Sequence, residues 1–424
     1  MKVYIIIISL FLISQNIFAQ NVITPATSPE ASGFSSERLQ RIDKVFKQYI
    51  DSNWIKGAVG FIAHDGKIVY NKAFGIDDIK TNSPLKTDAI FRIASQTKAI
   101  TSTAVMMLFE EGRFLLDDPI SKYIPAFAHP QVLKTFNEKD SGYTTEPAKR
   151  EITIRDLLTH TSGIDYAQIG SAKMRAIYAK AGVEAGFKLK KQLLADGIDK
   201  LGRLPLAANP GEQFIYSLSV DVLGRLVEVV SGKSLDDFFH ERIFTPLGMN
   251  DTYFHLPENK QSRLVQVYTE DKINNKLILW NDQTFPGGGI DYPVNNNGYF
   301  AGGAGLVSTI KDYAVFLQLF INGGEYNGNR LLSRHTVQLM TENQLGDIPF
   351  GDNKFGLGFM IITEKGSTKL GESAGSFEWG GFFGTTYWGD PKEKIVALMF
   401  VQQWPFSHGE LQDKFRALVY QALK

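Results

Sequence analysis

The chain has 424 residues with 45 Lys and Arg against 45 Asp and Glu, so its formal net charge is zero. A neutral chain without a basic cluster has nothing to neutralise a phosphate backbone, which excludes nucleic acid as an expected partner. Hydrophobic residues make up 43% of the sequence, as in ordinary globular proteins, and the absence of cysteine excludes disulfides, thiol nucleophiles, zinc-thiolate sites and lipid anchors on cysteine.

The first residues, MKVYIIIISLFLISQNIFAQ, have the pattern of an export signal. Lys2 precedes an apolar run from Val3 to Ile13, and a small residue follows at Ala19. A membrane-spanning helix needs about 20 apolar residues, and this run ends at Ser14. We therefore expect residues 1–19 to be a signal peptide cut near Ala19, and the mature protein to be periplasmic or secreted without a stable membrane anchor.

The next segments predict a helix and then a hairpin. Residues 35–52, SSERLQRIDKVFKQYIDS, carry apolar side chains at helical spacing behind two serines that can cap a helix. Residues 57–75, GAVGFIAHDGKIVYNKAFG, form two β-rich runs on either side of Asp65-Gly66, a dipeptide typical of tight hairpin turns. Strands are therefore expected early in the chain.

The middle of the chain is predicted to be mainly helical, and its end returns to strands. Helical periodicity covers Gln96–Glu111, Ile154–His160, Leu218–Val230, Leu235–Ile243 and Ile310–Ile321. Strand-like runs follow in GLGFMIIT, GGFFGTTYWG and KIVALMFVQQ, with a turn at Asp390-Pro391, and GELQDKFRALVYQALK closes the chain as a helix.

Strands and a helix at both ends predict an α+β fold, with one antiparallel sheet built from the two chain ends, helices flanking it, and a mostly helical region inserted between them. We expect a single domain over residues 34–424. Its sheet parts would cover about 34–90 and 350–424, and its helical insertion about 100–300.

Ser95 and Lys98 stand three residues apart in SQTK, a spacing that places a hydroxyl and an amine on one face of a helix. The same spacing occurs in two other places. At Ser83–Lys86 a proline in a turn-prone segment favours a loop, and at Ser308–Lys311 the serine is expected to cap a helix whose lysine faces solvent.

Lys98 differs because Ser102, Val105 and Phe109 follow on the same helical stripe, which directs its amine toward the interior. Burial disfavours an ammonium, so the neutral amine could take a proton from a nearby hydroxyl. The alternative is a lysine whose stem covers apolar surface while its amine reaches water.

A serine–lysine pair needs a third group to orient the amine and relay a proton to the leaving group. Tyr216 is the candidate, because it follows the turn at Pro210-Gly211 and precedes an amphipathic helix. An ordinary core tyrosine is the alternative at this position.

Six segments together resemble the β-lactamase-related serine hydrolases, which include class C β-lactamases, D-Ala-D-Ala carboxypeptidases and family VIII carboxylesterases. They are FRIASQTKAIT, IRDLLTHTSGI, NPGEQFIYSLSVDVLGRLVE, IFTPLGMNDT, GGAGLVSTIKDYAVFLQLFINGG and GSFEWGGFFGT. The resemblance runs from about Phe34 to the C-terminus and implies the β-lactamase/transpeptidase-like fold. It implies Ser95 as nucleophile, Lys98 as its base partner and Tyr216 in the second motif, with the oxyanion held by the Ser95 N–H and an N–H near Ser376.

Two departures from the family pattern affect the expected substrate. The second motif is usually Tyr-x-Asn, but here it is Tyr216-Ser217-Leu218, so the amide is missing. The third motif usually starts with Lys or His, but its counterpart is Ser373-Ala374-Gly375, followed by a WGG segment like that of family VIII esterases. A substrate carboxylate would find no cation there.

We therefore expect hydrolysis of a small carboxylic ester through an acyl-enzyme. The alternatives are a D-Ala-D-Ala carboxypeptidase or β-lactamase acting on cell-wall-like amides, and a penicillin-binding protein of low turnover. Candidate substrate or oxyanion residues are Gly375, Ser376, Trp379 and Gly380. The expected partner is a small ester or amide.

Three other features have weaker functional interpretations. Gly371–Gly375, GESAG, matches the nucleophile elbow, but an aromatic and glycine-rich stretch follows it instead of a helix. His160 near a helix end is expected to be structural. The seven histidines are scattered without a metal-binding pattern, so we expect neither a metal nor a cofactor.

Overall fold

The computed structural model describes residues 22–424 except 184–185, 187–191, 275, 281–288 and 296–297. The expected signal peptide, residues 1–19, lies outside the described residues. Within the described part of the chain, no helix is both long and apolar enough to cross a membrane.

A nine-stranded sheet forms the centre of the molecule, in the order β1-β3-β2-β17-β16-β15-β14-β13 with β4 paired to β3. All its pairings are antiparallel except that of β1 with β3. Its strands are β1 (Thr24–Pro25), β2 (Gly57–His64), β3 (Lys67–Asp78), β4 (Ser83–Pro84), β13 (Lys354–Phe355), β14 (Met360–Ile361), β15 (Phe377–Gly380), β16 (Thr386–Asp390) and β17 (Ile395–Phe400).

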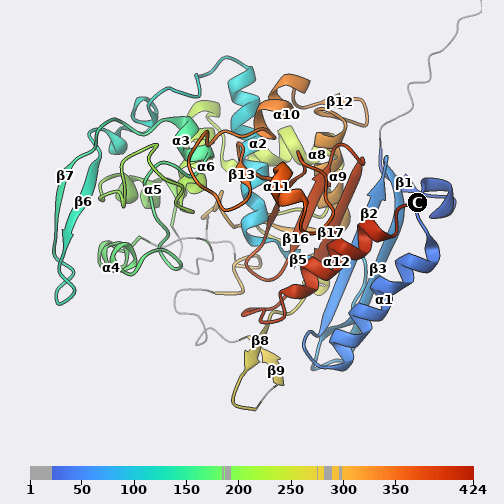
Figure 1. Cartoon of the computed structure of the whole chain (residues 1–424). Helices are drawn as coiled ribbons and strands as arrows, with labels where there is room; N and C mark the ends of the chain where they lie inside the picture. The colour runs from blue at the N-terminus through green and yellow to red at the C-terminus, as the bar shows by residue number, and fades with distance from the viewer. Residues whose placement is uncertain (1–21, 184–185, 187–191, 275, 281–288, 296–297) are drawn as a thin grey trace, which may run out of the picture.

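The two ends of the chain meet in this sheet. Strand β17 pairs with β2, from Ile395 opposite His64 to Phe400 opposite Val59, and Figure 1 shows the blue N-terminal strands beside the red C-terminal ones. The predicted hairpin joins β2 to β3 through Asp65 and Gly66, whose φ angles of 45° and 73° suit a tight turn. The expected sheet from both chain ends is confirmed.

Helices cover both faces of the sheet. On one face α1 (Ser36–Asp51) and α12 (Glu410–Gln421) pack against each other. The Ser35 side chain caps α1 by accepting a hydrogen bond from the Arg38 N–H. On the other face α9 (Ile310–Ile321) packs against β2, β16 and β17. The second face also carries the helix of the candidate site, α2 (Thr97–Glu110), which packs against α6 (Ser219–Ser231).

The remaining elements lie mostly between β5 and β13 in the chain. The other helices are α3 (Ile154–Leu158), α4 (Ala172–Ala181), α5 (Leu194–Gly202), α7 (Leu235–Phe239), α8 (Thr245–Leu247), α10 (Arg334–Met340) and α11 (Glu364–Ser367). Short 3-10 turns are η1 (Glu30–Ser32), η2 (Ala94–Gln96), η3 (Ile120–Lys122), η4 (Pro125–Phe127) and η6 (Glu258–Arg263), and η5 (His240–Phe244) is a π turn. Four two-stranded sheets pair β5 (Ile90–Arg92) with β10 (Val307–Thr309), β6 (Gln131–Phe136) with β7 (Tyr143–Pro147), β8 (Tyr268–Asp271) with β9 (Lys276–Leu279), and β11 (Glu325–Tyr326) with β12 (Asn329–Arg330).

Two expected strands differ from the structure. In GLGFMIIT only Met360–Ile361 forms a strand, because Gly358 takes a φ of 99° that interrupts extended backbone. In GGFFGTTYWG the strand begins at Thr386, because the Gly384 N–H donates to the Gly381 carbonyl and closes a turn between β15 and β16. The extent of a single domain over residues 34–424 stays a prediction.

Candidate active site

Ser95 lies in the 3-10 turn η2, directly before α2. The residue before it, Ala94, has a φ of 44°, a left-handed conformation that costs a non-glycine residue about 1–2 kcal/mol. Ala94 is held there by burial against Val267 and Phe383. Ser95 is half-exposed although its neighbours are buried, so the strained turn presents the Ser95 hydroxyl at the surface of the core.

Lys98 is buried, with 2% of its surface exposed, as its apolar stripe predicted. Its Nζ donates to the Ser95 Oγ at 3.2 Å and to the Gly303 carbonyl at 2.7 Å. The amine therefore does not reach solvent along an apolar surface. It is fixed between a hydroxyl and a backbone carbonyl.

Two tyrosine rings cover the amine. The Lys98 Nζ lies 4.6 Å from the ring centre of Tyr216 and 5.4 Å from that of Tyr166, and the two rings stack at 5.7 Å. The Trp379 indole N–H donates to the Tyr216 hydroxyl at 3.4 Å. The structure thus brings together four residues that lie far apart in the sequence, three of them expected and one, Tyr166, not.

Asp221 is a further residue of this cluster that sequence reasoning missed. It is 1% exposed on α6, and its Oδ1 accepts the Gly303 N–H at 3.4 Å, so Gly303 bonds to both Asp221 and Lys98. A Cβ on Gly303 would lie 2.6 Å from the Asp221 Oδ2, so this position has no room for a side chain. The sequence feature that could have indicated Asp221 is a carboxylate within the apolar run SVDVLG of a predicted helix.

Burial raises the pKa of Asp221 to about 6, and the nearby Lys98 charge acts in the opposite direction. Burial also holds the pKa of His160 well below its usual value, and the Lys98 charge adds to this effect. Both shifts arise because ionisable groups share a dry interior around one amine.

His160 packs against Tyr216, and among the residues that the structure describes no hydrogen bond joins it to Ser95. Its ring lies 4.9 Å from the Tyr216 ring, and its Nδ1 lies 3.0 Å from the Ser217 Oγ. It takes a φ of 56° at the second residue after α3. This location fits the structural interpretation, with His160 supporting Tyr216 from behind.

The expected oxyanion residues are only partly placed beside Ser95. The Ser376 N–H donates to the Ser373 carbonyl at 3.1 Å, so it is not available to an oxyanion in this conformation, and Gly375 is exposed on the same turn. Strand β15, with Trp379 and Gly380, instead lies against η2.

The closest approach of β15 to the serine turn is at its end. A Cβ on Gly381 would lie 2.4 Å from the Ile93 carbonyl, so the two backbones meet there. The Gly381 N–H donates to the Thr385 carbonyl on the β16 side. Because successive N–H groups of a strand point to opposite edges, Gly380 is the candidate donor on the edge away from β16.

The rival serines lie in different surroundings. Ser373 is in a turn that leads into β15 and not into a helix, so the strand-turn-helix context of a nucleophile elbow is absent there. Ser83 lies in the short strand β4. Ser308 was expected to cap a helix, but it lies buried in β10, and Thr309 caps α9 instead because its side chain reaches the Asp312 N–H.

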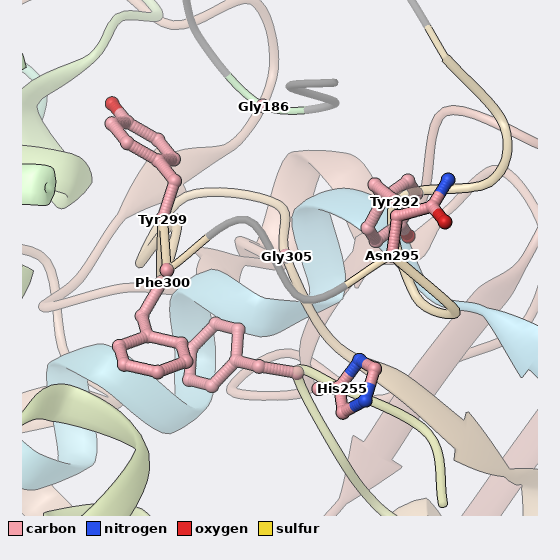
Figure 2. A pocket seen from close by; sticks show the side chains of 9 residues that line it. Gly186, His255, Tyr292, Asn295, Tyr299, Phe300 and Gly305 are labelled. Carbon is pink, nitrogen blue, oxygen red and sulfur yellow. The ribbon is translucent and has the colours of Figure 1, made fainter. Parts of the chain in front are cut away.

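Tyr216 also lines an open pocket of about 450 Å³, together with Ile169, Ala207 and Ile215. Figure 2 shows another pocket, lined by Tyr292, whose free volume of about 10 Å³ has room for one water molecule. The first can receive a small organic group and the second cannot. Within the described ranges, no group of three or more His, Asp or Glu side chains is placed to hold a metal ion.

Comparison with known proteins shows the family to which the chain belongs. The family model described as Beta-lactamase matches residues 42–421. The chain belongs to the Beta-lactamase family. As a member it is a serine hydrolase with the β-lactamase/transpeptidase-like α+β fold, which confirms the resemblance found in the sequence.

Relatives in the Beta-lactamase family have several activities. Esterase EstB of Burkholderia gladioli is 27% identical over 93% of this chain and 99% of its own length. A putative D-alanyl-D-alanine carboxypeptidase of Escherichia coli O157:H7 is 31% identical over 83% of this chain and 80% of its own. The solved structure of EstCE1, described as a hydrolase with promiscuous acyltransferase activity, is 26% identical with a TM-score of 0.78 and covers 91% of this chain and 99% of its own.

Proposed function

We propose that the protein hydrolyses small carboxylic esters through an acyl-enzyme on Ser95. The observation that carries the proposal is the 3.2 Å hydrogen bond between the buried Lys98 amine and the half-exposed Ser95 hydroxyl. A hydroxyl is a weak nucleophile unless a base takes its proton as it attacks. Lys98 is placed to do so.

The proposed reaction has two steps. The Ser95 Oγ attacks the ester carbonyl while its proton passes to the Lys98 Nζ. The bond to the alcohol oxygen then breaks, and the proton held by Lys98 passes through the Tyr216 hydroxyl to that oxygen, which leaves the acyl group on Ser95. In the second step a water oxygen bonds to the acyl carbon while the water proton passes to Lys98. The bond from the acyl carbon to the Ser95 Oγ then breaks, the Oγ takes the proton back, and the carboxylic acid is released.

The neighbouring groups support the charges that form. The Asp221 carboxylate and the two tyrosine faces stabilise positive charge on Lys98. The N–H groups of Ser95 and Gly380 are the candidate donors to the oxyanion. Loss of one such donor typically lowers turnover about 100- to 1,000-fold.

Two observations favour esters over carboxylate-bearing amides. The segment aligned with the third motif carries no cation, and the second motif has Leu218 where an asparagine would bind an acyl-amide. Similarity to esterase EstB and to EstCE1 agrees with this choice. The similarity to a putative D-alanyl-D-alanine carboxypeptidase supports the second candidate, hydrolysis of a cell-wall-like amide or slow acylation by one.

The test compares two chromogenic substrates and two serines. We expect turnover of 4-nitrophenyl acetate, weak turnover of nitrocefin, and loss of ester turnover by at least about 1,000-fold in Ser95→Ala. Ser373→Ala is the matched control and should keep the activity. A fluorophosphonate should label the peptide that contains Ser95. Fast turnover of nitrocefin without turnover of esters would favour the second candidate. Labelling of Ser373 would show that the assignment of Ser95 as nucleophile is wrong.

The export signal belongs to this proposal as well. The pattern of Lys2, the apolar run and Ala19 supports secretion or a periplasmic location. The mature N-terminus of protein collected outside the cytoplasm should then lie just after Ala19, and an N-terminus at Met1 would contradict the proposal.

A further inference from the structure

The pocket beside Tyr216 is built from two loops that flank the catalytic cluster. One loop follows α3 and contributes Ile169, and the other precedes α6 and contributes Ala207, Gln213 and Ile215. Tyr216 belongs both to this pocket and to the ring pair over Lys98. The pocket therefore begins one aromatic ring away from the amine that contacts Ser95.

Backbone hydrogen bonds join the two loops that line the pocket. The Ala207 N–H donates to the Gly163 carbonyl at 2.7 Å, and the Ile215 N–H donates to the His160 carbonyl at 2.8 Å. Gly163 has a φ of 80°, and a Cβ there would lie 2.1 Å from the Ala208 carbonyl, so the contact requires glycine. These bonds hold the walls in place before any ligand binds.

The lining combines aliphatic and uncharged polar side chains, and its one formal charge is not available to a ligand. Among the described lining residues only Asp165 is charged, and it is 4% exposed. Its Oδ1 accepts the Tyr166 N–H, and its Oδ2 accepts both the N–H and the hydroxyl of Ser171. A substrate carboxylate entering the pocket would meet a buried negative charge and no cation among these residues.

We infer that this pocket receives the alcohol part of the ester and selects uncharged, apolar alcohols, with Ile169, Ile215 and Gln213 as the residues that determine specificity. The inference rests on the proposed function. When Tyr216 relays the proton to the leaving oxygen, that oxygen lies at the Tyr216 hydroxyl, and the substituent on the oxygen extends from there. The pocket that Tyr216 lines with Ile169, Ala207 and Ile215 is the adjoining space, and its volume suits a small organic group.

The first experiment places a cation at the pocket. Gln213 is an exposed lining residue, so Gln213→Arg introduces a guanidinium with little risk to folding. The kcat/KM values for phenyl acetate and 3-carboxyphenyl acetate are measured, and their ratio is compared between variants so that intrinsic reactivity cancels. Gln213→Arg should shift the ratio toward the carboxylate substrate by about 5-fold, as expected for a partly exposed ion pair.

The matched control adds the same charge elsewhere. Gln40 is exposed on α1, on the face of the sheet covered by α12, and Gln40→Arg should leave the ratio of the two substrates unchanged. A third ester, 4-nitrophenyl hydrogen glutarate, carries its carboxylate on the acyl side. If Gln213→Arg favours this ester and not 3-carboxyphenyl acetate, the pocket holds the acyl part and the inference is overturned.

A second variant tests the apolar contact. Ile169 is 49% exposed, so Ile169→Ser should fold normally, and it should lower the kcat/KM ratio of hexyl acetate to methyl acetate by about 5-fold because apolar area is lost. Ratios that stay within twofold in both variants, with Ser95 labelled and esters consumed, would overturn the pocket assignment alone. Absence of both ester turnover and Ser95 labelling would overturn the proposed function instead.

Discussion

Lys98 has polar and aromatic groups around its amine as well as the apolar residues of its own helix. The Gly303 carbonyl accepts a hydrogen bond from the amine, and two tyrosine faces lie within 5.4 Å of it. The charges of Lys98 and Asp221 also act on each other. These groups would stabilise a positive charge that forms on the amine when it takes the Ser95 proton.

Asp221 should make stability depend on pH. The folded protein keeps the Asp221 proton up to about pH 6, whereas the unfolded chain releases it near 3.8. Because the folded state binds more protons over this interval, the free energy of unfolding should fall as pH rises through it. Between about pH 4 and about pH 7 this fall should reach up to about 3 kcal/mol in wild type. The side chain in Asp221→Asn cannot ionise, so the fall should be absent from this variant. Urea denaturation at the two pH values measures the free energy of unfolding.

The same substitution should change the pH profile of activity. If Lys98 gains charge as it takes the Ser95 proton, an ionised Asp221 stabilises the transition state, so kcat/KM should rise as pH increases through about 6. The Asp221→Asn variant should not show this rise, and its kcat/KM at pH values above about 6 should be lower than that of wild type by about 10-fold or more. A rise near pH 6 that persists in Asp221→Asn would contradict this assignment.

Asp312 provides the matched control for both measurements. Burial raises its pKa to about 6 as well, but its Oδ2 accepts the Asp251 N–H and the Thr252 hydroxyl, away from the candidate site. Asp312→Asn should flatten the dependence of stability on pH and leave the pH profile of activity unchanged.

At the scale of elements, the site depends on the contact between η2 and the end of β15. The second glycine of the WGG segment, Gly381, has no room for a side chain. A Cβ there would lie 2.4 Å from the Ile93 carbonyl and 2.2 Å from the Thr385 Oγ1. A larger residue would push β15 away from the serine turn. The oxyanion donors would then separate, although the rest of the sheet could keep its pairing.

Gly381→Ala tests this contact. The added methyl group must displace backbone, so we expect kcat for 4-nitrophenyl acetate to fall by about 100-fold or more, the effect of losing an oxyanion donor. Gly380→Ala is the milder comparison, because its Cβ would meet only the Thr385 carbonyl at 3.1 Å, and a loss of under about 10-fold is expected. Equal losses in the two variants would show that the close approach at Gly381 is not what positions the site.

The predictable elements are those whose signals are local. Helical periodicity and a serine cap predicted α1, and a dipeptide that accepts positive φ predicted the β2–β3 turn. The spacing of Ser95 and Lys98 predicted their contact, because three residues along a helix fix the geometry of a pair. Local pattern is sufficient where the structure is decided by neighbours in the chain.

The missed features depend on residues far apart in the sequence. Tyr166 joins the cluster only because its loop packs on Tyr216, and Asp221 matters only because Gly303 connects it to Lys98. The left-handed conformation of Ala94 has no composition signal, since burial against another segment imposes it. The Ser376 N–H is occupied within its own turn, a detail that no spacing rule supplies.

At the scale of the whole molecule, the two chain ends form the sheet that supports the candidate catalytic cluster. Strand β2 from the start of the chain pairs with β3 on one side and with β17 from the end of the chain on the other, and α1 and α12 cover the outer face. The apolar cluster between these helices and the sheet is separate from the larger one that contains α2 and α9. We therefore expect the outer face of the sheet to contribute mainly to stability, and the inner face to carry the candidate active site.

Phe415→Ala should separate these two contributions. Phe415 is fully buried on α12, 5.7 Å from the ring of Phe46 on α1 and 5.7 Å from that of Trp388 on β16, so it joins the beginning and the end of the chain. Its truncation leaves a cavity and should lower the free energy of unfolding by about 3–5 kcal/mol. Since no catalytic candidate belongs to this cluster of described residues, kcat per folded molecule should stay within about twofold of wild type.

Leu418→Ala on the same helix serves as the control. Leu418 is only partly buried, so its truncation should cost less than about half as much as that of Phe415. Urea denaturation gives the stability of each variant, and turnover of 4-nitrophenyl acetate well below the unfolding midpoint gives the activity. A loss of kcat in Phe415→Ala that exceeds its unfolded fraction would mean that the outer helices also position the serine turn across the sheet, and the division between the two faces would be wrong.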